Sequence, residues 1–477
     1  MDFLFQIGYL LICNLIVGTG ALALPKAFQS AGYVLSIVLL LVSAFTSYVS
    51  ATFIIEAMGI ANANEHRVML RKEKSKNRVE LESAFEITKR VEVASKYGVM
   101  FLSFIMTIYL FGDLAIYSTT VPNDSVKTNE ARNTNPCYGT WPHWLNRIAV
   151  YRLSVVAFTL FVTPLVVIGV TRTKYMQVTT SACRWTAFTI MIILACMRFG
   201  KHGVNLSKAA DMSGFGSLFG TTVYAFMCHH SLPSLVTPMK SKKGLCLWLI
   251  LVYGVIFLFY LLLSLTGILA FKEVFDVYPL NFLHGENKGV GYQIINYFLA
   301  LFPVFTLTSN YPIVANTLIN NFTVLLDTVY ELWFHKAKLP WSGRASVHPL
   351  EVQPKIDLTK SSDSDSDSVT VPHRNVVRYV VMAVIILVAT TIALCTDNVL
   401  ILSTVTGSYP GVGVQYIIPA LLVIYGRKHS RDQLTTAVPG NVRSPFKQNL
   451  WPYIMFGWSL ISIVMTTLNL CKVFDKI

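Results

Sequence analysis

Long apolar runs constrain this chain more than any other feature. A helix that crosses the hydrocarbon core of a bilayer needs about 17–25 apolar residues, and the sequence holds eleven runs suited to that role. They lie near residues 4–28, 34–58, 97–119, 149–170, 178–197, 215–238, 245–271, 291–319, 376–395, 399–425 and 451–470. Because lipid offers the backbone no hydrogen-bond partner, each run is expected to be helical. We therefore predict an all-α integral membrane protein of about eleven transmembrane helices, with residues 1–477 in a single domain.

Charge is scarce and lies between the runs. Only 13% of the residues are charged, whereas soluble domains carry about 25%. The net charge of +14 comes from lysine and arginine in the connecting segments, where they set membrane orientation, so we expect no nucleic-acid partner. The sequence also contains no nucleotide-binding loop and no hydrolase motif. We predict that the protein is not an enzyme and holds no metal cofactor.

The same charges indicate the orientation. With the N-terminus in the cytosol, the inside segments hold 26 Lys and Arg residues and the outside segments hold 10, as the positive-inside rule requires. Two glycosylation sequons, at Asn123 and Asn205, fall in outside segments. An odd number of spans then leaves the C-terminus outside or lumenal. The choice between a lysosomal or other internal membrane and the plasma membrane stays open.

Two long segments, 59–96 and 320–375, are predicted to be cytosolic loops. The first is charged and partly amphipathic. The second contains the acidic Ser/Asp tract 361–368, which cannot bury a core and is expected to be disordered. Both segments are candidate surfaces for cytosolic partners, and the simpler alternative is a solvated linker.

The first and sixth runs contain residues that interrupt a helix. Gly18 and Gly20 lie in the middle of the first run, and the sixth run includes the polar stretch 228–238 with two prolines. Glycine costs a helix interior about 1 kcal/mol and proline about 3 kcal/mol. An unwound stretch inside a bilayer must be satisfied by protein, water or a bound solute.

The positions of these breaks indicate a binding site. If the chain consists of two halves of five helices, spans one and six correspond and run in opposite directions. Broken helices at matching places of inverted halves mark a site near the bilayer midplane. Amides at Gly18, Thr19 and Gly20 would bind an anionic group at a positive helix end, and the second break adds Cys228 and Ser231 as substrate-binding candidates. The alternative is a pair of ordinary kinks, because Gly and Pro are common in membrane helices.

Several segments resemble one known family. Asn14-Leu-Ile-Val-Gly-Thr-Gly-Ala-Leu-Ala-Leu-Pro25 is similar to the first-helix signature of the amino acid/auxin permease family, and Ala225-Phe-Met-Cys-His-His-Ser-Leu-Pro233 is similar to its sixth helix. Segments 267–272 and 407–421 resemble its seventh and tenth helices. The resemblance covers nearly the whole chain except the loops. The sequence His229-His-Ser-Leu-Pro233 most resembles the variant found in one branch of this family. The resemblance implies a leucine-transporter-type fold, a 5+5 inverted repeat with broken helices 1 and 6, and amino acid transport coupled to protons or sodium.

Ionisable residues inside the spans are functional candidates, because they are costly in a membrane. Asp113, in the third span, is a candidate for proton coupling, and Tyr109 lies four residues before it on the same helix face. In the fold that the resemblance implies, the third helix borders the substrate, which makes Tyr109 a substrate-binding candidate. The alternative for Asp113 is a paired carboxylate near the outer interface. Other charges near span ends are interpreted as anchors: Lys26, Glu56 and Arg152.

His229 and His230, at the break of the sixth span, are further candidates for proton coupling because histidine titrates near neutral pH. Adjacent residues point about 100° apart on a helix, so at most one of them is expected to face the site. The alternative is a histidine that is hydrogen-bonded to backbone at the helix break.

Cation sites are predicted around the fifth and eighth spans. In proton-coupled proteins of the fold that the resemblance implies, a fixed cation replaces a sodium ion, which makes Arg184 a candidate cation mimic. The alternative is that Arg184 extends to the lipid headgroups. Candidate ligands for Na⁺ itself are Val17, Thr306, Thr308 and Ser309, although hydroxyls in membrane helices often bond to their own backbone.

The leading interpretation is a secondary active transporter of neutral amino acids, driven by H⁺ or Na⁺ through alternating access. Its partners would be a small-molecule substrate and the lipid bilayer, with the coupling ion as the only cofactor. The alternative is an amino acid sensor on the same scaffold without net flux, which the long cytosolic segments favour. A purely structural role, with neither binding nor flux, is a third hypothesis.

Overall fold

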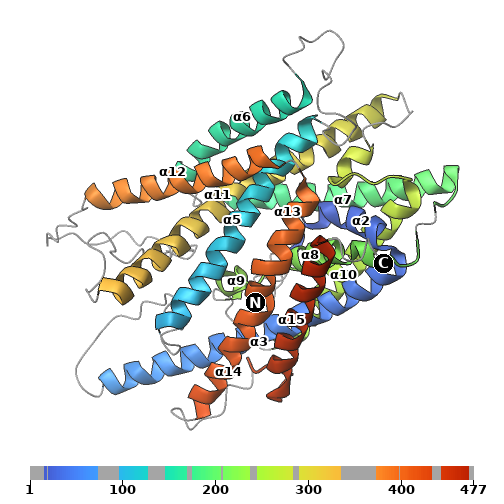
Figure 1. The fold of residues 1–477 in the computed structure, drawn as a ribbon. Coiled ribbons are helices and arrows are strands. Elements are labelled where there is room, and N and C mark those ends of the chain that lie inside the picture. The colour runs from blue at the N-terminus through green and yellow to red at the C-terminus, as the bar shows by residue number, and fades with distance from the viewer. Residues whose placement is uncertain are drawn as a thin grey trace, which may run out of the picture.

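The computed structural model of the chain is a bundle of long helices (Figure 1). It describes residues 16–18, 20–73, 96–126, 146–168, 174–205, 208–236, 244–282, 289–334, 372–396, 398–431 and 442–471. In these residues there is no β-strand, and nine helices are long and apolar enough to cross a membrane. The prediction of an all-α membrane protein is therefore confirmed.

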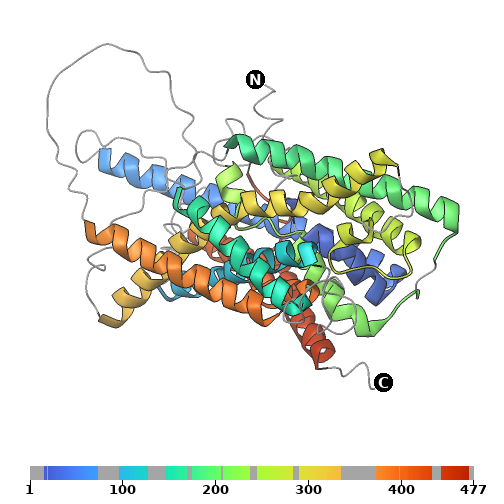
Figure 2. The same cartoon turned by 90° about the horizontal axis from the view of Figure 1, so that it is seen from above.

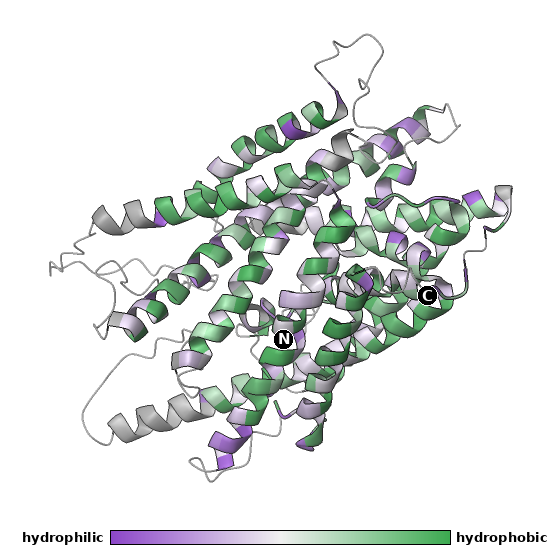
Figure 3. Ribbon diagram, in the orientation of Figure 1, coloured by the Kyte–Doolittle hydropathy of each residue, from purple (hydrophilic) through white to green (hydrophobic). Residues whose placement is uncertain are grey.

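The unbroken helices lie on the apolar runs. They are α3 (Tyr33–Glu73), α5 (Lys96–Val126), α6 (Arg147–Ile168), α7 (Lys174–His202), α10 (Leu245–Ala270), α11 (Val290–Phe334), α12 (Pro372–Cys395) and α15 (Leu450–Leu470). Their hydrophobic residues extend over most of each helix length (Figure 3). Large apolar side chains stay exposed on the outside, such as Leu160 at 69% and Leu247 at 73%, and a broad exposed apolar surface of this kind is suited to contact with lipid.

The tenth span changes its helical geometry in the middle. It begins as α13 (Val399–Thr406), passes through two π-helical turns, η5 (Gly407–Gly411) and η6 (Gly413–Ile417), and ends as α14 (Ile418–His429). Pro410 lies inside η5, where it removes one backbone N–H from the α-helical hydrogen-bond pattern. Single π turns inside α-helices are frequent at functional sites.

The first and sixth spans are broken. In the first, α2 (Gly20–Ala31) follows non-helical backbone at Val17 and Gly18. In the sixth, α8 (Phe215–Ala225) and α9 (Leu232–Val236) are separated by the six non-helical residues 226–231. These two spans are missing from the nine because each described helical piece is too short to cross a bilayer on its own.

The helices pack in two groups (Figures 1 and 2). Helices α5, α6, α11 and α12 pack on one another, and α2, α3, α8 and α10 form the second group. The fifth and tenth spans connect the groups, because α7 contacts both α10 and α11 while α13 contacts both α8 and α5. Spans 3 and 4 thus pair with 8 and 9, and spans 1 and 2 with 6 and 7. Each half contributes the same positions to each group, as a five-plus-five repeat requires.

Two helices continue beyond their apolar runs. Residues 59–73, predicted as loop, are the last part of α3, and α11 continues to Phe334 inside the predicted loop 320–375. The reason is local, since neither 60–73 nor 313–334 contains a glycine or proline to end the helix. We call the end of the bundle where α3 and α11 stop the long-loop end. It is the end that the sequence predicts to be cytosolic.

Candidate functional site

The two breaks meet where α2 begins and α8 ends. A Cβ atom added at Gly20 would lie 2.5 Å from the Cα of Ala225. Since carbon atoms in contact prefer separations of about 3.5–4.0 Å, only glycine fits at this position without displacing α8. The non-helical backbone before Gly20 is thereby brought next to the non-helical backbone after Ala225.

Tyr260 of α10 joins the two breaks. Its hydroxyl makes a shared hydrogen bond to the carbonyl oxygens of Ile16, at 2.9 Å, and Ala225, at 3.1 Å. An unwound carbonyl inside a membrane needs such a partner, and the Tyr260 side chain is fully buried. Sequence reasoning missed this residue, because a tyrosine in an apolar run carries no recognisable pattern.

Arg184 reaches the first break from α7. The side chain is buried, with 3% of its surface exposed, and its Nη1 donates a 2.6 Å hydrogen bond to the carbonyl oxygen of Val17. The interpretation that Arg184 extends to the headgroups is therefore wrong, because the side chain is buried and bonds to the backbone of the first break. A fixed positive charge therefore lies at the Val17 carbonyl, and Val17 is one of the residues predicted from the sequence to bind Na⁺.

Asp113 of α5 lies in the same region and is also buried. Its carboxylate accepts a 2.5 Å hydrogen bond from Tyr224, the second-last residue of α8. Tyr117, one turn further along α5, interacts with both Asp113 and Arg184. The carboxylate is thus held by tyrosine hydroxyls and does not lie at an exposed interface.

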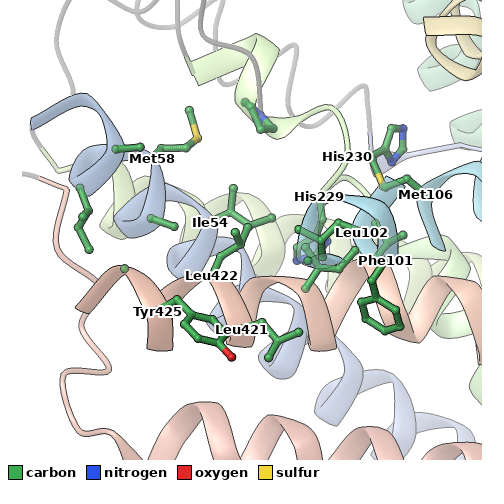
Figure 4. Close-up of a pocket in the computed structure, with 18 of the residues that line it drawn as sticks. Ile54, Met58, Phe101, Leu102, Met106, His229, His230, Leu421, Leu422 and Tyr425 are labelled. Atoms are coloured by element: carbon green, nitrogen blue, oxygen red, sulfur yellow. The ribbon is translucent and has the colours of Figure 1, made fainter. Parts of the chain in front are cut away.

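The two histidines of the second break have different surroundings. His229 is buried, and its Nε2 lies 2.8 Å from Ser50 Oγ and 3.2 Å from the Ser47 carbonyl oxygen. His230 contacts the ring of Tyr109, with 5.5 Å between the ring centroids. The Nδ1 atoms of both histidines are buried without a hydrogen-bond partner in the described part of the chain. Figure 4 shows the two rings pointing apart, as expected for adjacent residues.

The other candidates of the second break are held by local bonds. The Cys228 thiol lies 3.2 Å from the Tyr253 hydroxyl of α10, so it faces α10. The Ser231 amide bonds to the Cys228 carbonyl at 3.1 Å, which begins the turn into α9. Both residues therefore help to shape the break, and their binding role stays a prediction.

A polar network that the sequence did not reveal connects the break to the tenth span. Gln415, in the π turn η6, is fully buried, and its amide donates to the hydroxyl of Ser47. The Ser47 carbonyl is in turn a partner of His229. The available signal was the glutamine itself, a polar residue inside the apolar run 399–425.

The hydroxyl candidates of α11 differ in their partners, and Thr306 Oγ1 is buried without a hydrogen-bond partner in the described part of the chain. Ser309 Oγ donates to the Thr306 carbonyl at 2.8 Å and lies 3.4 Å from Thr180 Oγ1 of α7. Thr308 is half-buried. Since Thr180 lies one turn before Arg184, these hydroxyls approach the helix that carries the guanidinium. Their role as Na⁺ ligands stays a prediction.

Three residues predicted as binding or glycosylation sites lie at the edge of the described residues or outside them. Thr19 lies outside the described residues, and so does the side chain of Asn123 near the end of α5. Asn205 follows α7, and its backbone amide bonds to the carbonyl of Leu269 at 3.0 Å. Glycosylation of either asparagine stays a prediction.

An apolar cavity of about 140 Å³ extends from the second break toward the long-loop end. Figure 4 shows His229 and His230 at one end of it, with side chains from three helices as walls. The walls come from α3 (Ile54, Met58), α5 (Phe101, Leu102, Met106) and α14 (Leu421, Leu422, Tyr425). Although the two imidazoles point apart, both line the cavity. The expectation that at most one of them faces the substrate stays a prediction.

The opposite end of the bundle is packed. The side-chain amide of Gln29, near the end of α2, donates to the Lys272 carbonyl at 2.8 Å and accepts from the Val274 amide at 2.9 Å. Glycines at 220 and 407 let α8 and the tenth span touch backbone to backbone. The cavity at the second break thus lies on the long-loop side, and the α2 and α8 contacts on the other side are close.

Comparison with known proteins gives consistent matches over the full length. The family model described as "Transmembrane amino acid transporter protein" matches residues 5–468. The transmembrane protein 104 homolog of Caenorhabditis elegans is 45% identical, over 98% of this chain and 96% of that protein. Transmembrane protein 104 of Homo sapiens is 36% identical, over 97% and 96%, and the Dictyostelium discoideum homolog is 29% identical, over 96% and 95%. The names of these relatives state neither a substrate nor a coupling ion.

Proposed function

Because the chain belongs to the transmembrane amino acid transporter family, we propose that it is a secondary active transporter of neutral amino acids, coupled to H⁺ or Na⁺. One observation carries the proposal: helices one and six are both broken, and Tyr260 bonds to carbonyls at both breaks. Facing breaks expose backbone groups at the one place in a membrane bundle where a polar solute can replace helix hydrogen bonds.

The breaks supply complementary groups for an amino acid. The start of α2 carries the positive end of the helix dipole, which suits the substrate carboxylate. In the described structure the Gly18 and Ala21 amides bond to the carbonyls of Ile16 and Gly18, at 2.8 and 3.3 Å. The Gly18 backbone is half-exposed and would meet nothing closer than 3.9 Å with an added Cβ, which leaves room for a ligand beside it. Carbonyls of the two breaks suit the substrate amine.

The position of Arg184 favours a proton over sodium as the coupling ion at the first break. A guanidinium bonded to the Val17 carbonyl repels Na⁺ from that oxygen, and arginine stays charged in proteins. A titrating group is then needed elsewhere. His229, whose Nδ1 has no partner within the described residues, is the first candidate, and Asp113 is the second.

The proposed movement is a rocking of the two helix groups. Helices α2, α3, α8 and α10 would move against α5, α6, α11 and α12, with the fifth and tenth spans as connections. The cavity at the long-loop end and the contacts at the opposite end match a cytosol-facing state, if the predicted orientation holds. The same proposal includes symport and glycosylation at Asn123 and Asn205. It places the protein in a lysosomal or other internal membrane or in the plasma membrane.

One feature favours the alternative, an amino acid sensor. Helices α3 and α11 contain 41 and 45 residues, which correspond to about 60–70 Å at 1.5 Å per residue. The hydrocarbon core is only about 30 Å thick, so both helices have the length to extend beyond it. Such extensions are suited to binding cytosolic partners.

Uptake into proteoliposomes tests the proposal. Purified protein would receive a mixed pool of labelled amino acids under an inward H⁺ gradient, an inward Na⁺ gradient or neither. We expect uptake driven by the H⁺ gradient and abolished by Gly20→Trp, which forces α2 away from α8. Gly254→Trp is the matched control, because a Cβ at Gly254 meets nothing within 4 Å. Amino acid binding without uptake under any gradient would favour the sensor.

A further inference from the structure

The cavity at the long-loop end lies between the two helix groups. One wall belongs to α5, which packs with α6, α11 and α12, and the others to α3 and α14, which pack on each other. Its inner end is the second break, because His229 and His230 line it. The segment 226–231 thus borders both the cavity and, through Ala225, the contact with Gly20.

The walls of the cavity are almost entirely apolar. No Asp, Glu, Lys or Arg lines the cavity in the described part of the chain, and its polar groups are confined to Tyr425 and three histidines, His229, His230 and His429. The central walls are Ile54, Leu102, Met106 and Leu422. A charged side chain placed there would lose its water and gain no counterion, which is strongly unfavourable.

The volume of the cavity, which is partly open, indicates which side chains it has room for. In another protein, an apolar cavity of about 150 Å³ binds benzene, so a space of about 140 Å³ holds a group of four to seven carbon-sized atoms. That range matches the side chains of leucine, isoleucine, methionine and phenylalanine. Alanine, serine and glycine would leave most of the apolar wall without contacts.

We propose that this cavity binds the side chain of the transported amino acid and selects large apolar side chains. The inference rests on the proposed function, since the substrate backbone is held by the two breaks and its side chain enters the cavity past His229 and His230. Tyr109 contacts His230, and Met106, about one turn before Tyr109 on α5, lines the cavity. Tyr109 and His230 therefore lie at the end of the cavity that is nearest the second break.

Competition binding tests the inference without requiring flux. Labelled leucine is bound to purified protein, and unlabelled amino acids compete for the site. In the wild type we expect Leu, Ile, Met and Phe to compete, while Lys, Arg, Asp and Glu do not. Hydrophobic pockets discriminate one methylene by about 10- to 200-fold, so leucine should compete at least tenfold better than alanine.

Two variants locate the pocket. Met106→Trp fills the cavity. We expect it to weaken the binding of leucine and phenylalanine at least tenfold, while the binding of alanine changes less than threefold. Leu422→Ala enlarges the cavity and should improve the binding of phenylalanine relative to that of leucine. The matched control is Phe104→Trp, two residues from Met106 on the same helix, because Phe104 is 52% exposed and does not line the cavity.

The outcomes separate the inference from the function on which it rests. If leucine binds but both cavity variants leave the order of competitors unchanged, or if charged or small amino acids compete best, the side-chain assignment is wrong and the transporter proposal stands. If the wild-type protein neither binds nor takes up any amino acid, both are wrong.

Discussion

Two opposite charges lie within the bundle, Asp113 on α5 and Arg184 on α7. Tyr117 interacts with both of them. Tyr224 bonds to the carboxylate, and Arg184 bonds to the Val17 carbonyl. Because Tyr117 interacts with both charges, a change at one of them alters the surroundings of the other. We therefore expect Asp113 and Arg184 to be coupled through Tyr117.

This coupling predicts the effect of neutralising either charge. Arg184→Gln should abolish gradient-driven uptake and lower the midpoint of thermal unfolding, because Asp113 keeps its charge and Val17 loses its donor. Asp113→Asn combined with Arg184→Gln should be less destabilised than Arg184→Gln alone, since no unpaired charge remains. Thermal unfolding in detergent measures both effects.

The control for this experiment is another arginine of α7. Arg198 lies 4.7 Å from the centre of the Phe271 ring and is exposed, so Arg198→Gln should change uptake less than twofold. A double variant whose destabilisation equals the sum of the two single variants would show that Asp113 and Arg184 are independent.

At the scale of elements, α3 is held to α14 by a buried ion pair. Arg427 binds both carboxylate oxygens of Glu56, at 2.7 and 2.9 Å, and the Ser444 amide adds a 3.1 Å bond. Glu56 is 1% exposed, so its interpretation as an interface anchor is wrong. Both helices that it joins line the cavity, and the pair therefore holds these two walls together.

We expect Glu56→Gln to destabilise the protein by about 3–5 kcal/mol, because it leaves the Arg427 charge without its partner. Arg427→Met alone should be similarly harmful, and the double variant should recover part of the loss. Unfolding measured on all four proteins gives the coupling energy. Asp211→Asn is the control, since the Lys208–Asp211 pair is exposed and such pairs contribute about 0–1 kcal/mol. A coupling energy near zero between Glu56 and Arg427 would show that this ion pair does not hold α3 to α14.

At the scale of the whole molecule, the two ends of the bundle differ. The cavity opens at the long-loop end, and Gln29 and the 220/407 glycine contact close the other. A transporter at work exchanges these states, because a substrate must never have open paths to both sides at once. Under the proposed function, the described structure would represent one of these two states.

Cysteine labelling tests this asymmetry. Leu421→Cys, in the cavity wall, should react with a membrane-impermeant maleimide from the long-loop side only. Phe219→Cys is the control, because Phe219 is fully buried in α8 and should react from neither side. Both are compared with the unsubstituted chain, whose eight cysteines set the background. Reaction of position 421 from the opposite side would contradict the predicted orientation.

The sequence by itself determined the fold class and the place of the breaks. Apolar length decides which segments cross a bilayer, because unpaired backbone groups are so costly in lipid. The same cost makes Gly18, Gly20 and the 228–238 stretch visible as interruptions, and the described structure has non-helical backbone at residues 17–18 and 226–231. Helix ends were less predictable, as α3 shows, because charged residues that leave the membrane can still continue a helix.

Only the tertiary structure decided what the polar residues contact. An arginine alone in an apolar helix has the same sequence pattern whether it reaches the headgroups or the core, and Arg184 faces the core because α7 packs against α10 and α11. Tyr260 and Gln415 had no pattern at all, since their partners are backbone and side chains more than 30 residues away in the sequence. Contacts between distant segments depend on how helices are packed, and that information is absent from the periodicity of any single run.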